Sequence, residues 1–341
     1  MTPSVLAVDG GNSKTDVALV APDGGLLAAV RGPTTSHQAV GLEAGIDRLV
    51  GLVEEVVRQA GLDPSTRPIS TIGVHAIAGA DFTADVRMLE RALAGARLSK
   101  RDIVVNDCIG ALWAGASEGW GIALICGQGI NGAAIAPDGR TARFDGVGDV
   151  SGDWGGGTSV GMSGLAAAVR ARDGRGPRTL LERVVPAHFG LRRPSAVTRA
   201  FYDDRIAAAR VGELSPVVFG AAGEGDPVAR SIVDRLADEL ATMAVALARR
   251  TAMTRQPVEV VLAGGVFRTT DEPFFDRIES GIRAVVRDAR LVRLDVPPVT
   301  GAALHGLDLV GGARSARQVA RERLRTDLKA WSRQISALRN P

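Results

Sequence analysis

The stretch that most constrains the fold lies at residues 5–20, where an apolar run is interrupted by a short polar turn and then resumes. Two apolar segments around a turn rich in Gly, Asn and Ser predict a β-hairpin. The turn residues are Asp9, Gly10, Gly11, Asn12, Ser13, Lys14 and Thr15. Backbone N–H groups, hydroxyls and one ammonium would gather there, which suits a polyphosphate. An ordinary Asp-Gly hairpin turn, which needs no ligand, is the alternative at this point.

The turn matches neither of the two common phosphate loops. GxxxxGK[ST] is absent because the adjacent glycines precede Lys14 by three and four residues, and GxGxxG is not matched. Asp9, at the predicted end of the first strand, is placed to hold a phosphate-bound Mg²⁺. The chain has only three Lys against 38 Arg. A lysine in this turn therefore indicates a need for a compact point charge.

Composition favours an α/β protein of two lobes. The chain has 341 residues, 45% of them hydrophobic, with 42 glycines for tight turns. No run approaches the ~18 apolar residues of a membrane span, and the N-terminus enters a strand without the regions of a signal peptide, so we expect a cytoplasmic protein without a membrane partner. Cys108 and Cys126 lack CxxC spacing, which argues against a zinc site or a disulfide framework. The four histidines are scattered, so no protein-held metal is predicted beyond the role of Asp9.

The net charge of +3 conceals a basic C-terminal segment. From Gly311 onward eight basic and two acidic residues give +6, which leaves −3 for the rest of the chain. A nucleic-acid arm is one interpretation. However, apolar residues recur there at spacings of 4, 3, 4 and 3, as in one stripe of a helix. They are Leu324, Leu328, Trp331, Ile335 and Leu338. We therefore interpret the segment as a docked terminal helix and expect no nucleic-acid partner.

The first third of the chain predicts a three-strand meander followed by βαβ-type units. Beyond the hairpin, strands are expected at 26–30, 69–77 and 103–105, and helices at 42–57, 81–94 and 109–116. The strand at 103–105 delivers Asn106 and Asp107 to its end. Polar groups are expected at the ends of the strands.

The pattern then restarts, which we interpret as an internal repeat. A strand at 122–126, the turn Gly127-Gln128-Gly129 and a second strand lead to Ala136-Pro137-Asp138-Gly139, which mirrors Ala21-Pro22-Asp23-Gly24. Two hairpins could share turn chemistry by chance, but the order matches as well. Residues 146–157 are too rich in glycine to predict regular structure. Helices are expected at 165–172, 180–185, 194–209, 215–220, 226–251 and 301–310, with strands at 258–262 and 291–294. We expect one lobe from 1–115 with 311–341, and a second from 116–310.

Five segments resemble, in order and spacing, the motifs of the sugar kinase, heat-shock chaperone and actin superfamily. They are the turn 9–15, Asn106-Asp107, the loop 126–131, Gly152-Asp153 and Ala263-Gly264-Gly265. Within it the chain resembles the BadF/BadG/BcrA/BcrD-type ATPase family over residues 5–310, most of all its N-acetylglucosamine kinases and actinobacterial-type glucosamine kinases. The resemblance implies an α/β fold of two ribonuclease-H-like (actin-like ATPase) lobes with a central cleft. It also implies ATP and Mg²⁺ as cofactors, a small-molecule amino sugar as substrate and a homodimer.

The resemblance also implies residue roles. Two facing turns would grip the triphosphate by backbone N–H groups, and a glycine pair would let adenine lie against bare backbone. The ATP-binding residues implied are 9–15 as named above, Gly127, Gln128, Gly129, Ala221, Ala263, Gly264 and Gly265, with Asp9 positioning Mg²⁺. Asp107 is the expected general base, accepting the proton of a sugar hydroxyl. From the residues alone, Asp107 could instead be the N-cap of the helix that follows.

For the sugar, the implied residues include two segments in which this chain departs from the family. They are Ser36, His37, Asn106, Asp107, Gly146, Val147, Gly148, Asp149 and Asp153. The N-acetylglucosamine kinases carry Asn-His where this chain has Ser36-His37, and a Trp and a His at Val147 and Asp149. An anionic Asp149 would favour a 2-ammonium over a 2-acetamido group. We therefore expect glucosamine, phosphorylated at O6, with N-acetylglucosamine as the alternative; Asp149 could also be a solvated turn residue.

Two other functions are weighed. An ATPase that activates a radical enzyme through an iron–sulfur cluster needs exposed cysteines, whereas Cys108 and Cys126 lie in apolar stretches within the motifs. A sugar-sensing regulator would use the same residues for binding only, but no helix-turn-helix precedes Val5.

Overall fold

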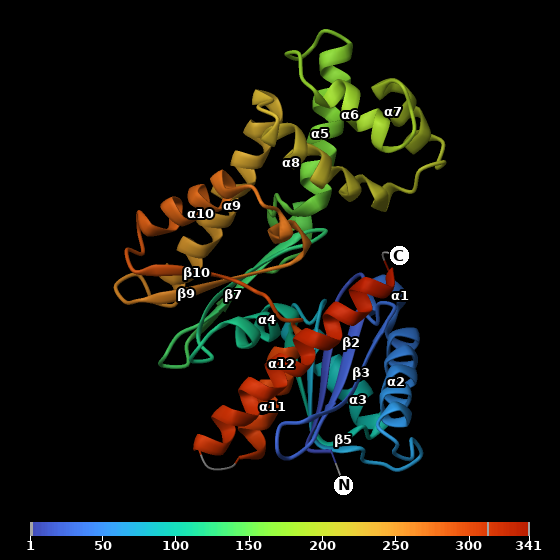
Figure 1. The fold of residues 1–341 in the computed structure, drawn as a ribbon, viewed down its shortest axis with the longest axis vertical. Coiled ribbons are helices and arrows are strands. Elements are labelled where there is room, and N and C mark those ends of the chain that lie inside the picture. The colour runs from blue at the N-terminus through green and yellow to red at the C-terminus, as the bar shows by residue number, and fades with distance from the viewer. Residues whose placement is uncertain (1–2, 312–313, 340–341) are drawn as a thin grey trace. The chain divides into compact units, whose positions relative to one another are not determined.

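The computed structural model describes residues 3–311 and 314–339, with side chains in the second stretch described from 318 to 337. The chain divides into two compact units, Met1–Trp120 with Arg293–Pro341 and Gly121–Val292. Each unit is built on its own five-stranded mixed sheet with helices packed against it (Figure 1). The predicted α/β class is confirmed.

The first unit has its hairpin at the centre of the sheet. The strand order is β3-β2-β1-β4-β5; β1 is antiparallel to β2 and parallel to β4, and β4 is parallel to β5. The strands are β1 (Val5–Gly10), β2 (Thr15–Val20), β3 (Leu26–Gly32), β4 (Ser70–Ile77) and β5 (Ser99–Asn106). Every residue of β1 and β2 is buried, which explains their almost continuous apolar sequence.

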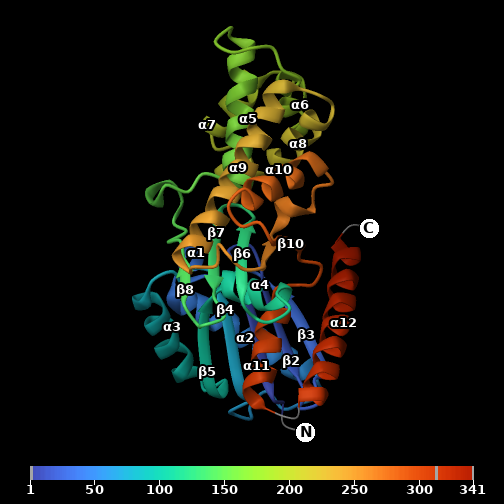
Figure 2. The same ribbon diagram turned by 90° about the vertical axis from the view of Figure 1, so that its left-hand side faces the viewer.

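Helices cover both faces of this sheet. The helices are α1 (His37–Val40), α2 (Leu42–Gln59), α3 (Thr83–Ala96), α4 (Asp107–Gly115), α11 (Val299–Val310) and α12 (Arg314–Arg339). Helices α2 and α3 bury their apolar stripes on one face. Helices α11 and α12 pack on the other, and α12 runs along the sheet as the last element of the chain (Figure 2). The docked terminal helix is therefore confirmed from Arg314 to Arg339, although the side chain of Leu338 lies outside the described residues.

The second unit repeats the plan with a larger helical layer. Its sheet has the order β10-β9-β6-β7-β8, with β6 antiparallel to β7 and parallel to β9. The strands are β6 (Gly121–Cys126), β7 (Ile130–Ile135), β8 (Thr141–Arg143), β9 (Val258–Ala263) and β10 (Ala289–Arg293). The helices are α5 (Gly156–Arg172), α6 (Leu181–His188), α7 (Pro194–Tyr202), α8 (Ser215–Gly223), α9 (Pro227–Arg250) and α10 (Glu272–Arg283), with 3₁₀ turns η1 (Gly148–Ser151), η2 (Ala208–Leu214) and η3 (Gly265–Arg268). Helix α9 packs on β6 and β7, and α10 packs on α9.

The internal repeat is visible in the hydrogen bonds of the two Pro-Asp-Gly turns. In the first, Ala21 donates to the Gly25 carbonyl at 2.9 Å and Gly24 to that of Ala21 at 3.0 Å. In the second, Ala136 donates to the Arg140 carbonyl at 2.8 Å and Gly139 to that of Ala136 at 2.9 Å. Both turns therefore have the same hydrogen bonds, and each joins the second and third strands of a meander, β2 to β3 and β7 to β8. In both units the first strand of the meander, β1 or β6, pairs in parallel with a later strand.

Three predictions about elements were wrong. Helix α5 begins at Gly156 rather than near residue 165, because its glycines permit backbone contacts that a side chain would block: a Cβ on Gly161 would lie 2.0 Å from the Val211 carbonyl oxygen. The helix predicted at 194–209 ends at Tyr202. Helix α11 belongs to the first unit rather than the second, because it packs closely on α4 and β1. A Cβ on Gly301 would lie 1.8 Å from the Gly110 oxygen, and one on Gly306 would lie 2.3 Å from Val5.

In the part of the chain that the structure describes, no helix combines the length and the hydropathy needed to cross a lipid bilayer.

Candidate functional site

The strand register of the first unit brings three carboxylates together at one edge of its sheet, those of Asp9, Asp81 and Asp107. Gly10 of β1 pairs with Ile77 of β4, which pairs with Asn106 of β5. The three parallel strands therefore end in the same row, and the residues that follow them meet there. These are the hairpin turn after β1, the loop with Asp81 after β4, and Asp107 after β5.

The hairpin turn is closed by a hydrogen bond from the Gly11 N–H to the Lys14 carbonyl at 2.9 Å. Gly10 is buried in β1, Gly11 is half-buried, and Asn12 and Ser13 form the exposed tip. The Thr15 hydroxyl faces the interior of the unit rather than the tip of the turn. The side chain is buried, and its Oγ1 lies 3.0 Å from that of Thr35. The Thr15 side chain therefore connects the hairpin to the segment at Thr35. A ligand of the hairpin turn would contact its exposed tip at Asn12 and Ser13.

Lys14 joins an ion network that the sequence did not predict. Its Nζ lies 2.6 Å from Asp16 Oδ2 and 3.3 Å from Asp9 Oδ2. Asp16 also accepts two hydrogen bonds from Arg31, Nε to Oδ1 at 2.6 Å and NH2 to Oδ2 at 2.8 Å. Burial lowers the pKa of Lys14, but the charges of Asp9 and Asp16 outweigh it and raise that pKa. Burial raises the pKa of Asp9 in spite of the nearby ammonium. Lys14 is thus a firmly held cation.

Asp107 is the first residue of α4, and its carboxyl group is strongly perturbed. Burial, followed by the charges of Asp9 and Asp81, raises its pKa from 3.8 to about 7. It does not cap the helix: the cap is Asn106, whose side chain accepts from the Cys108 N–H at 3.0 Å. A carboxylate that is half protonated near neutral pH is suited to general base catalysis.

Asn106 supports this arrangement rather than offering a free amide to a ligand. It is 4% exposed, and its Nδ2 donates to Asp81 Oδ1 at 2.8 Å. Gln38 Nε2 donates to the other Asp81 oxygen at 3.1 Å. Both ends of the Asn106 amide are therefore engaged. Asp81 was missed by the sequence analysis because it stood in a segment predicted to be helical.

The predicted sugar segment lies beside these groups and has unused polar atoms. Ser36 is the N-cap of α1, and neither its buried Oγ nor the buried Nδ1 of His37 has a hydrogen-bond partner among the described residues. The Thr34 hydroxyl ties the segment to the turn by donating to the Gly11 carbonyl at 2.8 Å. Buried polar atoms without partners are uncommon, which makes Ser36 and His37 suited to a polar ligand.

In the second unit, the turn Gly127-Gln128-Gly129 packs against the start of α5. The Gly157 N–H donates to the Gly127 carbonyl at 2.7 Å, and the Thr158 N–H to that of Gln128 at 3.0 Å. Gly156 has φ +74°, and a Cβ there would lie 2.5 Å from the Gln128 oxygen. Gln128 and Gly129 are exposed. The start of α5 therefore holds the turn by two backbone hydrogen bonds, while the tip at Gln128 and Gly129 is exposed to solvent.

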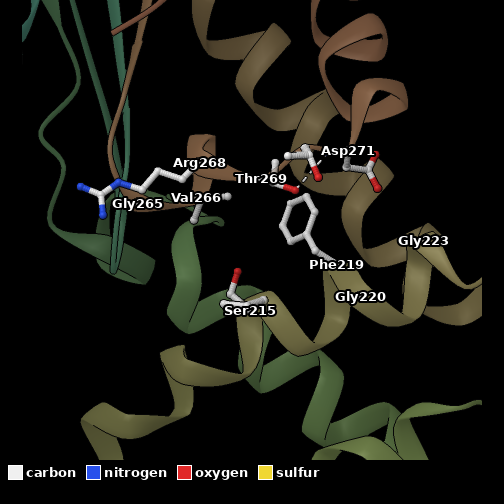
Figure 3. A pocket seen from close by; sticks show the side chains of 11 residues that line it. Ser215, Phe219, Gly220, Gly223, Gly265, Val266, Arg268, Thr269 and Asp271 are labelled. Atoms are coloured by element: carbon white, nitrogen blue, oxygen red, sulfur yellow. Dashed lines mark hydrogen bonds between the residues drawn. The ribbon is translucent and has the colours of Figure 1, made fainter. Parts of the chain in front are cut away.

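A cavity of about 650 Å³ lies between α8 and the segment that follows β9. Figure 3 shows the Ser215 hydroxyl and the Phe219 ring directed into it, whereas the Arg268 side chain points away. A Cβ on Gly220, Gly223 or Gly265 would meet no atom within 4 Å. The wall is thus mainly apolar and partly bare backbone, which can accept a flat ring.

Only some of the residues predicted to bind ATP line this cavity. Gly265 lines it, but Gly264 does not: a Cβ on Gly264 would lie 2.3 Å from the Cys126 carbonyl oxygen, so this glycine permits strand packing. Ala263 and Ala221 are buried and do not line it either. Gly220 and Gly223 of α8 line the cavity and were not among the predicted residues. The spacing of these glycines by three residues was the available signal.

The loop from 146 to 153 carries the remaining predicted sugar residues. Gly146 packs against Asn131, where a Cβ would lie 2.2 Å from Nδ2. Val147, Gly148 and Asp149 are exposed, and Asp149 lies on η1 with no ion-pair partner among residues 3–311 and 314–339. Asp153 accepts a hydrogen bond from the Ser151 hydroxyl. Within this unit Asp149 is therefore a solvent-exposed carboxylate.

No group of three or more His, Cys, Asp or Glu side chains in the described stretches is arranged to hold a metal ion. Magnesium in phosphoryl-transfer sites is held mainly by phosphate oxygens and water, with one or two carboxylates. The buried carboxylate of Asp9 beside the turn fits that pattern.

Comparisons with known proteins agree with this architecture. Residues 6–318 match the model of the BadF/BadG/BcrA/BcrD ATPase family. The chain is 30% identical to an N-acetylmuramic acid/N-acetylglucosamine kinase of Clostridium acetobutylicum over 77% of this chain and 85% of that protein. It is 25% identical to an N-acetyl-D-glucosamine kinase of Dictyostelium discoideum, over 89% and 97%.

Among solved structures, one from Chromobacterium violaceum, described provisionally as an N-acetylglucosamine kinase, is similar with a TM-score of 0.69 and 25% identity. The match covers 89% of this chain and 99% of that one. This likeness confirms the predicted fold class, two ribonuclease-H-like lobes of the actin-like ATPase type.

Proposed function

Because this chain belongs to the BadF/BadG/BcrA/BcrD ATPase family, we propose that it is an ATP-dependent hexosamine kinase with Asp107 as general base. The reaction transfers the γ-phosphoryl group of ATP to the O6 hydroxyl of an amino sugar. The observation that carries the proposal is the environment of Asp107, whose pKa is raised to about 7 beside the turn of Lys14.

The proposed chemistry follows from the positions of the first unit's groups. The Asp107 carboxylate accepts the O6 proton as that oxygen attacks the γ-phosphorus, and ADP departs with the β-phosphate oxygen. Lys14 supplies a fixed positive charge to the phosphates. Asp9 would hold Mg²⁺, which when bound neutralises charge on the transferring group. Ser36 and His37 offer unpaired polar atoms to sugar hydroxyls.

The cavity beside α8 is the proposed place for the adenosine. Its volume of about 650 Å³ exceeds the lower end of ordinary ligand pockets, about 300 Å³, and its glycine-lined wall suits a planar base. The exposed tip of the turn at Gln128 would then meet the phosphates of the same nucleotide.

For the sugar we propose N-acetylglucosamine as the preferred substrate, in place of glucosamine. The preference for glucosamine depended on a desolvated carboxylate at Asp149, whereas that side chain is exposed on a 3₁₀ turn, where solvent weakens its attraction for an ammonium. The relatives at 30% and 25% identity are named for N-acetylated sugars. A homodimer and a cytoplasmic location remain predictions from the sequence.

A sugar panel tests the proposal. We expect kcat/KM for N-acetylglucosamine to exceed that for glucosamine and for glucose by at least ~10-fold, since a site built for an amide leaves its polar groups unpaired when that amide is missing. The assay couples ADP release to a chromogenic reaction, with phosphate position determined by ³¹P NMR. A higher kcat/KM for glucosamine would restore glucosamine as the expected substrate. If no sugar of the panel is phosphorylated, the proposal that the protein is a kinase is refuted.

The competing functions give distinct results in the same preparation. Both cysteines, Cys108 and Cys126, are buried, so neither is available at a surface to hold an iron–sulfur cluster. Iron in an anaerobic preparation would contradict this. Sugar binding without ATP turnover would indicate a regulator.

A further inference from the structure

Three adjacent strands present a row of charged side chains at the end of the first unit's sheet. Asp9 of β1 pairs with Asp16 of β2, and Asp16 pairs with Arg31 of β3. The alternation of strand residues places all three on the face that α11 and α12 cover, together with Ala7, Ala18 and Ala29. Only Asp9 of this row was expected to contact a ligand.

The row is neutral only when Lys14 is included. Two carboxylates directly opposite each other repel, and the Asp16 side chain is fully buried, so it requires cations around it. Lys14 and Arg31 supply two positive charges against the two negative charges of Asp9 and Asp16. Loss of either cation would leave a net negative charge where an anionic phosphate chain is proposed to bind.

Lys14 is anchored by Asp16 more closely than by Asp9. The ammonium lies 2.6 Å from Asp16 and 3.3 Å from Asp9. Asp16 in turn is fixed by the two-point contact with Arg31, whose planar guanidinium matches a carboxylate. Asp9 is thereby left able to serve another cation while Lys14 keeps its position.

The C-terminal helix completes the arrangement. The Arg31 guanidinium lies over the Trp331 ring, 5.4 Å from its centroid. On the same helix, Leu324 and Leu328 are fully buried against the sheet face, so the position of Trp331 is determined by the docking of α12. A cation over an aromatic face is stabilised electrostatically, which orients Arg31 toward Asp16.

We propose that Asp16, Arg31 and Trp331 are positioning residues for Lys14, so that the C-terminal helix contributes to binding the triphosphate. This inference rests on the proposed function, because it requires that the turn binds a nucleotide. It assigns roles to three residues that touch no substrate themselves. With Arg31 removed, Asp16 loses the two-point contact that holds it, and the row becomes negative before the phosphates arrive.

The test measures the Kd of the nonhydrolysable analogue AMP-PNP with Mg²⁺ by calorimetry, and KM for ATP and for the sugar, on the full chain. Arg31→Gln is expected to raise the Kd and the KM for ATP by at least ~10-fold, the effect of about 1.4 kcal/mol, with the sugar KM within about twofold. Arg31→Lys, which keeps the charge, should recover part of the loss. Trp331→Leu should raise the Kd about threefold and Trp331→Phe less, in line with a cation–π contact.

Arg323→Gln is the matched control, because it breaks an exposed ion pair between α12 and Asp23 without touching Arg31. It should leave the Kd unchanged. A Kd that is unchanged in Arg31→Gln and Trp331→Leu, with only the Tm lowered, would make the network structural and overturn the inference. If Arg31→Gln does not fold, Arg31→Lys and Trp331→Leu decide by the same criterion. Wild-type protein that binds no nucleotide would instead refute the proposed function.

Discussion

Among single residues, one carboxyl group of the first unit differs from its neighbours in its surroundings. Asp16 is fully buried but lies against two cations, whereas the Asp107 carboxyl is buried near the carboxylates of Asp9 and Asp81. The second environment disfavours the charged form. Asp107 is therefore the group whose protonation state changes near neutral pH, and this property makes the base assignment testable.

Activity should follow the titration of Asp107. The pKa is raised to about 7, and only the carboxylate can accept the O6 proton, so kcat/KM should fall as the pH drops through 7 and level off above it. At pH 6 we expect about one tenth of the limiting value. The measurement is kcat/KM for the sugar from pH 5.5 to 9 at saturating ATP. A flat profile down to pH 5.5 would remove Asp107 as the titrating base.

Single residues were the least predictable level. Asp9, Lys14 and Asp107 could be singled out because they stand beside glycines or at strand ends in a recognisable order. Asp16 and Arg31 could not, because each reads as one polar residue in a strand, and their pairing depends on the register between strands. The exposure of Asp149 likewise depends on the path of a glycine-rich loop.

At the scale of elements, the cavity in the second unit depends on which face of α8 is open. Phe219 packs edge-on against Phe274 of α10, while Gly220 and Gly223 face the cavity. The helix therefore contributes one aromatic ring to the packing of the unit, and at Gly220 and Gly223 it offers bare backbone to the cavity. This division allows the nucleotide site to be blocked without disturbing the core.

Gly220→Leu should fill the cavity and weaken nucleotide binding. A Cβ at this position meets no atom within 4 Å, so the new side chain occupies open space. We expect the Kd for AMP-PNP to rise at least ~10-fold, while the helix gains up to about 1 kcal/mol from loss of a glycine. Calorimetry and thermal unfolding measure the two effects.

Gly95→Leu is the matched control for this substitution, since Gly95 is an exposed helical glycine of α3 with equal space around it. It should leave nucleotide binding unchanged. Equal Kd values for Gly220→Leu and wild type would exclude the cavity as the adenosine site.

Most strands and helices could be predicted from periodicity and turn residues, because apolar runs of six to eight residues between Gly, Pro or Asp signals correspond directly to buried strands such as β1 and β4. Helix α5 could not, because its first turns consist largely of glycine and carry no apolar pattern. Its start is determined by contacts with the turn at Gln128, which lie outside any local window.

At the scale of the whole molecule, the first unit is made from two separate parts of the chain. Residues 121–292 form the second unit, and the chain then returns so that α11 and α12 cover the open face of the first sheet. The small residues of α11 determined this boundary: Gly301 and Gly306 allow contacts with α4 and β1 too close for any side chain. Hydropathy alone gave no sign of which unit the helix joins.

The proposal assigns the base for the sugar hydroxyl to the first unit and the adenosine cavity to the second. The two roles can therefore be separated by substitution. An Asp107 variant that still binds the nucleotide but no longer transfers the phosphoryl group would show that Asp107 acts in the chemical step and not in maintaining the fold.

The most direct test is turnover and nucleotide affinity of Asp107→Asn, an isosteric change that removes the base. The account predicts a loss in kcat of at least ~10²-fold, with the Kd for AMP-PNP within about twofold of wild type and the fold retained. Turnover near the wild-type rate in a folded Asp107→Asn protein would contradict the account.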